Sequence, residues 1–209
     1  MLSLPRVCHV FAVALWFGSV AFFSVAGVLI FESFREVSAL PADQRPAWLP
    51  LPELYARESP EGFPTPLRLE QGSRAAGVAV GGIFPVYYAA QVGCGAVALL
   101  TAMALARRGE GSGHGVRLFL CGLALASVLA GWCLEVRVAE LRLPRNGLTD
   151  QALASPSPPT ELLAEAREAR AAFGRWHGFS LIQNFVTLIL TAALTFYIPS
   201  LSAAPPRGR

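Results

Sequence analysis

The chain has 209 residues, of which 54% are hydrophobic and 15% are charged, and its formal net charge is +3. A soluble domain has nearer a quarter charged residues, so the composition argues against an ordinary soluble protein. The arginines form no cluster interleaved with aromatic residues, which argues against nucleic-acid binding. Four stretches contain no Asp, Glu, Lys or Arg, and they cover residues 7–31, 75–106, 118–134 and 176–206.

The first charge-free stretch predicts a membrane-spanning helix over residues 7–31. A helix needs about 17–25 mostly apolar residues to cross the hydrocarbon core. The stretch is continuous and lacks the alternating polarity of an outer-membrane strand. A cleaved signal peptide is the alternative, because Arg6 precedes the stretch and Ser24-Val25-Ala26 resembles a cleavage site. The apolar run continues to Phe31, however, and is therefore as long as a span.

The middle of the chain predicts two more spans. Residues 32–74 carry seven prolines, so any regular structure in this outer connection is expected to be short and broken. Residues 78–106 form the second predicted span, which Pro85 is expected to kink. A Gly-rich turn follows at residues 107–117, and residues 117–138 form the third span.

The last part of the chain predicts a second long connection, at residues 139–175, and a fourth span at residues 177–198. Residues 161–173 are rich in Ala, Glu and Arg, and Thr160 is a plausible N-cap, so a short amphipathic helix on the membrane surface is expected there. The predicted fold is therefore all-α: an integral membrane four-helix bundle that forms a single domain over residues 1–209, with two long extramembrane connections and a surface helix.

Charge distribution predicts the orientation of this bundle. The side with the N-terminus, the short link and the C-terminal tail carries six arginines and a single glutamate, whereas charges nearly balance in the long connections. These residues are Arg6, Arg107, Arg108, Arg117, Arg207, Arg209 and Glu110. The positive-inside rule places this side in the cytoplasm, together with both termini. The use of arginine without lysine, with abundant Ala, Gly and Pro, suggests a bacterial inner membrane protein.

Small residues recur every four positions in two spans, which predicts where the helix backbones approach closely. In the second span they are Gly77, Gly81, Pro85, Ala89 and Gly93, and in the third they are Gly122, Ala126 and Ala130.

The fourth span carries a polar stripe at intervals of three or four residues, which places its members on one helix face. They are His177, Ser180, Asn184, Thr187, Thr191 and Thr195. Such a face turns inward in lipid and either hydrogen-bonds to other helices or lines a path for a ligand or ion.

The predicted topology brings further polar residues to the outer ends of the spans. Arg74, Glu135, Arg137 and His177 are expected at one membrane depth, with Tyr87, Tyr88 and Asn184 deeper. An Arg–Glu ion pair at this outer end would either tie the second and third spans together or form part of a binding site. The candidate polar cluster consists of Arg74, Tyr87, Glu135, Arg137, His177, Ser180 and Asn184.

Metal and haem sites have little support in the sequence. Cys8, His9, His114 and Cys121 could form an inner metal site, but adjacent residues of a helix diverge by about 100°. His9 and His177 are expected near opposite membrane faces and cannot ligate one haem. The four cysteines read as small buried hydrophobes, so no cofactor is predicted. The motifs of nucleophile elbows, zinc proteases and phosphate-binding loops are also absent.

A resemblance to a known family covers all four spans. The segment from Phe173 through His177-Gly178-Phe179-Ser180 to Asn184 resembles the start of the last helix in the transmembrane protein 205-like family. The segments 132–137, 84–87 and 9–18 resemble that family's other helices, except that Val136 replaces a proline and an extra residue separates Trp132 from Leu134. The Pro-rich residues 39–66 look foreign to it. The resemblance implies a four-helix membrane domain of poorly defined function, with Arg74, Tyr87, Glu135, Arg137, His177 and Asn184 in one outer cluster.

The leading functional hypothesis is a non-enzymatic structural or accessory subunit in the lipid bilayer, whose two long outer connections meet a partner membrane protein. Transport or binding of a small solute, metal or drug through the polar stripe is the alternative. A redox protein that carries haem or metal is the third hypothesis.

Overall fold

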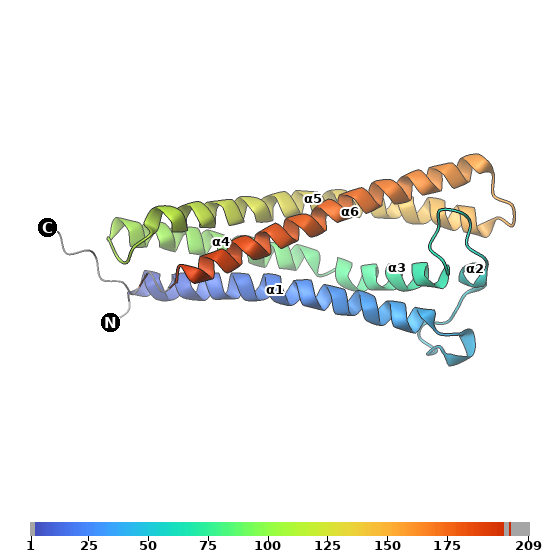
Figure 1. Cartoon of the computed structure of the whole chain (residues 1–209), viewed down its shortest axis with the longest axis horizontal. Coiled ribbons are helices and arrows are strands. Elements are labelled where there is room, and N and C mark those ends of the chain that lie inside the picture. Colours follow the sequence, from blue (N-terminus) through green and yellow to red (C-terminus); the bar gives the residue numbers. More distant parts are fainter. Residues whose placement is uncertain (1–2, 199–200, 202–209) are drawn as a thin grey trace. The chain divides into compact units, whose positions relative to one another are not determined.

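The chain is all-helical in the computed structural model, which describes residues 3–198 and residue 201 (Figure 1). No strand occurs in these residues. The elements are α1 (Leu4–Ala39), the short 3-10 helix η1 (Ala42–Gln44), α2 (Glu53–Ala56), α3 (Arg68–Gly81), α4 (Phe84–Arg107), α5 (His114–Ala154) and α6 (Thr160–Phe196). The predicted all-α class is therefore confirmed.

Four of the helices are long and apolar enough to cross a membrane: α1, α4, α5 and α6. They contain 36, 24, 41 and 37 residues. At a rise of 1.5 Å per residue, α1, α5 and α6 are each more than about 50 Å long, whereas a hydrocarbon core is roughly 30 Å thick. Each of these three helices is therefore longer than a bilayer crossing requires. In each helix the charged residues lie outside the charge-free stretch.

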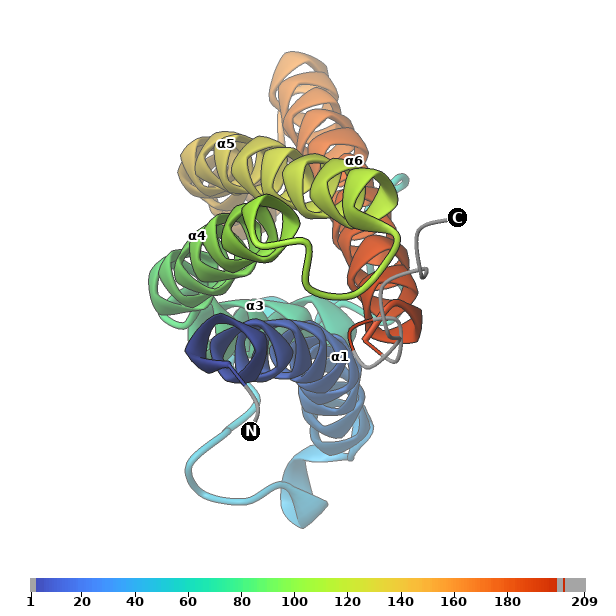
Figure 2. The same ribbon diagram turned by 90° about the vertical axis from the view of Figure 1, so that its left-hand side faces the viewer.

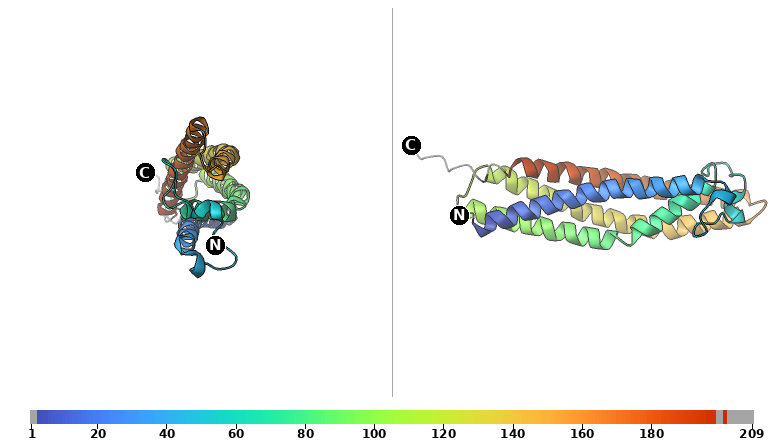
Figure 3. Two further views of the ribbon diagram at one scale, coloured as in Figure 1. Left: turned by 90° about the vertical axis from the view of Figure 1, so that its right-hand side faces the viewer. Right: turned by 90° about the horizontal axis from the view of Figure 1, so that it is seen from below.

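The second predicted span is interrupted rather than kinked (Figure 3, right). Helix α3 ends at Gly81, and the backbone N–H groups of Gly82 and Ile83 both bond to the Val80 carbonyl. Helix α4 begins at Phe84, which places Pro85 in its first turn, where the absent N–H costs no hydrogen bond. The prediction of a continuous helix kinked at Pro85 is therefore wrong, because the proline starts a new helix.

The helices α5 and α6 extend well beyond the third and fourth predicted spans. Helix α5 continues to Ala154 and contains Pro144. Helix α6 begins at Thr160, as the N-cap pattern suggested, but runs without interruption to Phe196. Residues 161–173 are therefore the first part of one long helix and do not form a separate surface helix.

The chain divides into two compact units. Unit 1 comprises Met1–Ser24, Pro85–Leu134 and Phe179–Arg209, and unit 2 comprises Val25–Phe84 and Glu135–Gly178. The termini at 1–2, 199–200 and 202–209, including the arginines at 207 and 209 used to predict orientation, lie outside the described residues. Unit 2 contains 13 of the 14 Asp and Glu residues and 11 of the 17 arginines.

Unit 1 packs parts of α1, α4, α5 and α6 together (Figure 2). Trp16 of α1 is fully buried, and Gly95 of α4 makes room for it. A Cβ at Gly95 would lie 2.8 Å from the Trp16 ring and 2.9 Å from Leu125 Cδ1 of α5. Three helices therefore meet at this glycine.

Most of the predicted small-residue positions do not face a neighbouring helix. A Cβ at Gly77, Gly93 or Gly122 would meet nothing within 4 Å, and Ala126 and Ala130 are exposed. One predicted position does lie against another helix, because a Cβ at Gly81 would be 2.7 Å from Arg142 Nη1 of α5. Other close contacts involve glycines that the four-residue pattern did not include: Gly72, Gly95 and Gly131. A repeat of small residues indicated that close packing exists but did not identify the buried helix face.

Unit 2 has its own apolar core, to which the Pro-rich connection contributes. Phe63 and Leu67 pack with Ala152 and Leu153 of α5 and with Ala166 of α6. The same connection is fixed by polar contacts of one arginine. The Arg45 guanidinium donates to the Gln71 side chain at 2.5 Å and to the backbone carbonyls of Ser38 and Leu40.

Candidate functional site

A buried glutamate in α3 organises the charges of unit 2. The Glu70 carboxylate is 1% exposed and accepts hydrogen bonds from three arginines. Its Oε1 lies 3.0 Å from Arg74 Nε and 2.5 Å from Arg145 Nη2, and its Oε2 lies 3.0 Å from Arg170 Nη2. Three helices, α3, α5 and α6, are therefore joined through one side chain. Glu70 and these three arginines are called the Glu70 cluster below.

A second carboxylate and three aromatic rings surround the Glu70 cluster. Arg74 Nη1 lies 2.5 Å from Asp150 Oδ1. The three guanidinium groups each lie near an aromatic ring, with centroid distances of 6.0, 5.0 and 5.1 Å for the pairs Arg74–Tyr55, Arg145–Phe173 and Arg170–Phe63. Cation–π contacts of this kind add to the ion pairs when the groups are shielded from water.

Opposing effects act on the pKa of Glu70, and the arginines prevail. Burial raises the pKa, because an ionised carboxylate loses its water. The hydrogen bond from Arg170 and the charges of Arg145 and Arg170 lower it further than burial raises it. The pKa of Glu70 therefore lies below its ordinary value, and the carboxylate is ionised at neutral pH.

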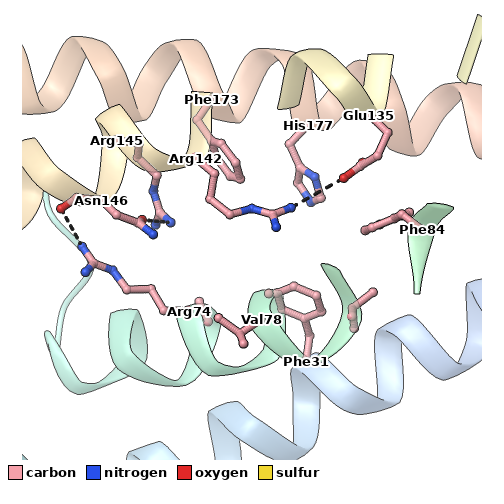
Figure 4. A pocket seen from close by; sticks show the side chains of 13 residues that line it. Phe31, Arg74, Val78, Phe84, Glu135, Arg142, Arg145, Asn146, Phe173 and His177 are labelled. Atoms are coloured by element: carbon pink, nitrogen blue, oxygen red, sulfur yellow. Dashed lines mark hydrogen bonds and ion pairs between the residues drawn. The ribbon is translucent and has the colours of Figure 1, made fainter. Parts of the chain in front are cut away.

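A pocket of about 250 Å³ adjoins the Glu70 cluster within unit 2 (Figure 4). Arg74 and Arg145 belong to both features. The lining residues come from α1, α3, α4, α5 and α6, and they are Phe31, Ser73, Arg74, Gly77, Val78, Val80, Phe84, Glu135, Arg142, Arg145, Asn146, Phe173 and His177.

One wall of the pocket is polar. Figure 4 shows Arg142 of α5 extending toward Glu135 and lying close to the His177 ring of α6. Arg142 Nη2 is 3.5 Å from Glu135 Oε1, which is an ion pair but a long one. The His177 ring stacks on Phe173 with a centroid distance of 5.7 Å. Among the described residues, neither the Arg142 guanidinium nor the His177 imidazole has a hydrogen-bond partner.

The opposite wall is apolar and open. Phe31, Val78 and Phe84 face the polar groups across the pocket (Figure 4). Val78 is 77% exposed, so the pocket has an opening beside it. Ser73 also lines the pocket, but its hydroxyl donates to the Leu69 carbonyl of its own helix.

The pocket lies where the charge-free parts of the helices end. Phe31 is the last residue of the first charge-free stretch, and Glu135 directly follows the third. His177 is the second residue of the fourth stretch, and Val78 lies near the start of the second. The pocket therefore lies at the boundary between the charge-free and the charged parts of all four apolar segments.

The structure separates the predicted polar cluster into several parts. Arg74, Glu135 and His177 line the pocket. Arg137 does not: its guanidinium bonds to Glu140 at 2.9 Å and lies 5.9 Å from the centroid of the Trp176 ring. Three further predicted residues belong to unit 1, and these are Tyr87, Ser180 and Asn184.

Within unit 1, the polar stripe of α6 is engaged in hydrogen bonds. Asn184 accepts from the Tyr87 hydroxyl at 2.7 Å and donates to the Ser24 hydroxyl at 2.8 Å. The Thr187 hydroxyl is 2.8 Å from that of Ser127. The small cavity beside these groups has a volume of about 10 Å³, enough for no more than one water molecule. These contacts support a packing role for this part of the stripe.

The candidate metal ligands are dispersed. The described residues contain no group of three or more His, Cys, Asp or Glu side chains that could hold a metal. The Nδ1 atom of His9 is instead 3.0 Å from both the Ala98 carbonyl oxygen and the Thr101 hydroxyl. Cys121 is buried and Cys8 is half-buried, and neither forms a disulfide.

Sequence reasoning missed most of the charged site. Glu70, Arg142, Arg145, Asp150 and Arg170 lie in segments that were read as connections. One signal was available, because Glu70 and Arg74 are spaced as an i,i+4 ion pair on a helix. The other contacts span 75 or more residues, and no local pattern predicts them.

No protein-family model matches this chain, and no curated protein or solved structure matches it either. The functional interpretation therefore depends on the residues of the site itself.

Proposed function

We propose that the chain is a non-enzymatic, multi-pass integral membrane protein that acts as a structural or accessory subunit. The observation that carries this proposal is the presence of four helices that are long and apolar enough to span a bilayer. Three of them carry charged extensions, and unit 2 contains 13 of the 14 acidic residues and 11 of the 17 arginines. In this arrangement unit 2 extends from the bilayer on one side and offers the partner-binding surface.

The contacts of Glu110 are consistent with cytoplasmic termini in a bacterial inner membrane. Glu110, in the link between α4 and α5, forms ion pairs with Arg6 at 3.9 Å and Arg108 at 3.7 Å, and it also accepts a hydrogen bond from Ser3. The start of α1 and this link therefore lie together at the Arg-rich end of unit 1, which the positive-inside rule assigns to the cytoplasm. Unit 2 is then exterior, and membership of the transmembrane protein 205-like family is part of the same proposal.

Labelling of single cysteines in intact cells tests the orientation. After the four native cysteines are replaced, Glu58→Cys in the Pro-rich connection should react with an impermeant maleimide. Gly111→Cys in the short link should react only after the cells are permeabilised. The reverse pattern would overturn the proposed orientation, and extraction of the protein by carbonate would overturn membrane insertion.

Purification in mild detergent tests the accessory role. A cross-linker applied before extraction should capture a defined membrane protein through unit 2, and loss of residues 42–64 should weaken that capture. A monomer that captures no defined protein would count against an accessory subunit.

Binding of a small solute is the second candidate function, and the pocket of unit 2 favours it. The pocket combines three arginines and a histidine with aromatic and aliphatic side chains. This mixture of apolar surface and a few convergent polar groups is typical of small-molecule sites. A bound solute and a protein partner are compatible in one accessory subunit.

A further inference from the structure

We infer that the pocket of unit 2 binds an amphipathic anion, a molecule with a phosphate or carboxylate head and an apolar chain. The inference deepens the second candidate function above and rests on it, as well as on the proposed placement of the chain in a membrane. It names the ligand class and the groups that recognise each end of the ligand.

Arg142 and His177 recognise the anionic head. Both side chains line the pocket, and neither has a hydrogen-bond partner among the described residues. A guanidinium has five N–H donors in a planar fork, which matches the oxygens of a phosphate or carboxylate. The imidazole can donate a further hydrogen bond from either ring nitrogen, depending on its tautomer.

The carboxylate in the pocket is compatible with an anion. Glu135 contacts Arg142 on one side only, at 3.5 Å, so the guanidinium retains donors for a second acceptor. Three arginines, Arg74, Arg142 and Arg145, line the pocket, and Glu135 is the one carboxylate among the lining residues. With the Glu70 cluster and Asp150 included, four arginines face three carboxylates, and the remaining positive charge favours an anionic head over a cationic one.

The apolar wall receives the chain of the ligand. Phe31, Val78 and Phe84 lie across the pocket from Arg142 (Figure 4). The volume of about 250 Å³ is below the roughly 300–1,000 Å³ of pockets for drug-sized ligands, so a head group and the first part of a chain fill it. A longer chain leaves through the opening beside the exposed Val78.

The position of the pocket determines which ligands can reach it. Its lining residues Phe31, Glu135 and His177 lie at the ends of three charge-free stretches. In a spanning protein this is the level of the lipid head groups, where an amphipath has its head in water and its chain in lipid. The source of the ligand is therefore either a bilayer phospholipid or a free amphipath such as an alkyl phosphate.

Binding measurements on the full chain test the inference and distinguish the two sources. The protein is placed in nanodiscs of phosphatidylcholine and titrated with octyl phosphate by isothermal calorimetry. A second preparation contains phosphatidylglycerol, and native mass spectrometry records which lipid remains bound after the disc is removed. Saturable binding of octyl phosphate alone indicates a free amphipath, and selective retention of phosphatidylglycerol indicates a lipid. The absence of both overturns the inference.

Two arginines of α5 provide a matched pair of variants. Arg142→Gln should weaken binding about tenfold or more, because a hydrogen bond to a charged group is lost. Arg137→Gln removes the same charge and also breaks an ion pair, but Arg137 does not line the pocket. The affinity of this variant for the ligand should therefore stay within about twofold of that of the parent protein. Equal effects of the two substitutions would overturn the assignment of the head-binding group.

A third variant tests the pocket without changing a charge. Gly77 lines the pocket, and a Cβ there meets nothing within 4 Å, so Gly77→Leu fills the space without a backbone clash. Binding should fall about tenfold or more, and unchanged affinity would overturn the inference even if Arg142→Gln does not fold. Carbonate extraction is measured on membranes from the cells that express each variant. A protein that stays in the membrane but binds neither ligand refutes the ligand inference alone, whereas an extracted protein refutes membrane insertion.

Discussion

Units 1 and 2 draw on the same long helices, yet they satisfy their buried polar groups differently. Along most of unit 1 the pairs are neutral, such as the Gln91 amide with the Ser19 hydroxyl at 2.8 Å. Its charged contacts, those of Glu110 and Arg117, lie at the link between α4 and α5. In unit 2 the central group is the ionised Glu70, held by three arginines. Desolvating an ion is costly in hydrocarbon, whereas neutral hydrogen bonds are tolerated there. The contrast is the one expected if unit 1 lies in lipid and unit 2 extends into water.

The difference also predicts unequal sensitivity to substitution. A neutral hydrogen bond between helices in a membrane contributes on average about 0.6 kcal/mol. Removal of one partner from a buried ion pair costs about 3–5 kcal/mol, because the remaining charge is left without compensation. The following experiments test this comparison in order of decreasing expected effect.

The substitution Glu70→Gln should have the largest effect. It leaves Arg145 and Arg170 largely buried without their carboxylate, and the opening free energy of unit 2 should fall by about 3–5 kcal/mol. Hydrogen–deuterium exchange should accelerate in α3 and in residues 160–175 of α6, and remain slow in α4.

The matched control for this substitution is Glu140→Gln. Glu140 also pairs with an arginine, Arg137, but the two side chains are 57% and 50% exposed. Such an exposed pair contributes about 0–1 kcal/mol, so exchange should hardly change. If the two glutamates gave the same result, the central role of Glu70 would be refuted.

Acid should weaken unit 2 through the same residue. The pKa of Glu70 is lower in the folded protein than in the unfolded chain, so its contribution to stability is complete above the unfolded value of about 4.3. That contribution is lost as the pH falls through the folded pKa. Thermal unfolding followed by circular dichroism should therefore show a drop in Tm below about pH 4.

The Glu70→Gln variant separates this effect from the titration of other carboxylates. Its Tm should fall less steeply with acid than that of the parent, because the titrating group is gone. Parallel curves for the two proteins would mean that Glu70 does not contribute to the acid sensitivity.

Packing in unit 1 is tested by two neighbouring glycines of α4. Gly95→Ala places a methyl group 2.8 Å from the Trp16 ring, and such overpacking typically costs about 1–3 kcal/mol. Gly93→Ala meets nothing within 4 Å and should be neutral or stabilising by up to about 1 kcal/mol, since alanine favours helix. Unfolding in sodium dodecyl sulfate measures both, and a reversed order would show that α4 is rotated from the described orientation.

The smallest effect is expected for Tyr87→Phe. This change deletes the hydroxyl that donates to Asn184 and keeps the ring, which stacks on Phe23 with a centroid distance of 4.1 Å. The expected loss is about 0.6 kcal/mol in the same unfolding assay. A loss as large as that of Glu70→Gln would remove the proposed distinction between the two units.

The sequence allowed the apolar part of the fold to be predicted, because charge-free stretches depend only on local composition. It also singled out Arg74, Glu135 and His177, which the structure places on one pocket. Their position at the ends of charge-free stretches made this prediction possible. The separation of Tyr87 and Asn184 into another unit could not be predicted, since membrane depth alone does not fix which helices pack.

The charged contacts of unit 2 were not predicted, and particular residues show why. Pro144 normally ends a helix, yet α5 continues through it to Ala154. The segment that contains Arg142, Arg145 and Asp150 lies beyond the third charge-free stretch and was for that reason read as a connection. Arg170 was placed on a surface helix, where its charge would have been solvated and not directed at Glu70. The positions of these side chains depend on contacts between residues far apart in the chain, and no periodic pattern in the sequence predicts such contacts.

The Glu70 cluster also sets an order for assembly during synthesis. Glu70 is separated from Arg145 by 75 residues and from Arg170 by 100 residues along the chain. A nascent chain that ends before α6 can form only the contacts of Glu70 with Arg74 and Arg145. The third arginine arrives with the last helix, so the charge of Glu70 is fully compensated only when translation has passed Arg170. Synthesis of the first part of the final helix thus serves as the step that completes the charge contacts of unit 2.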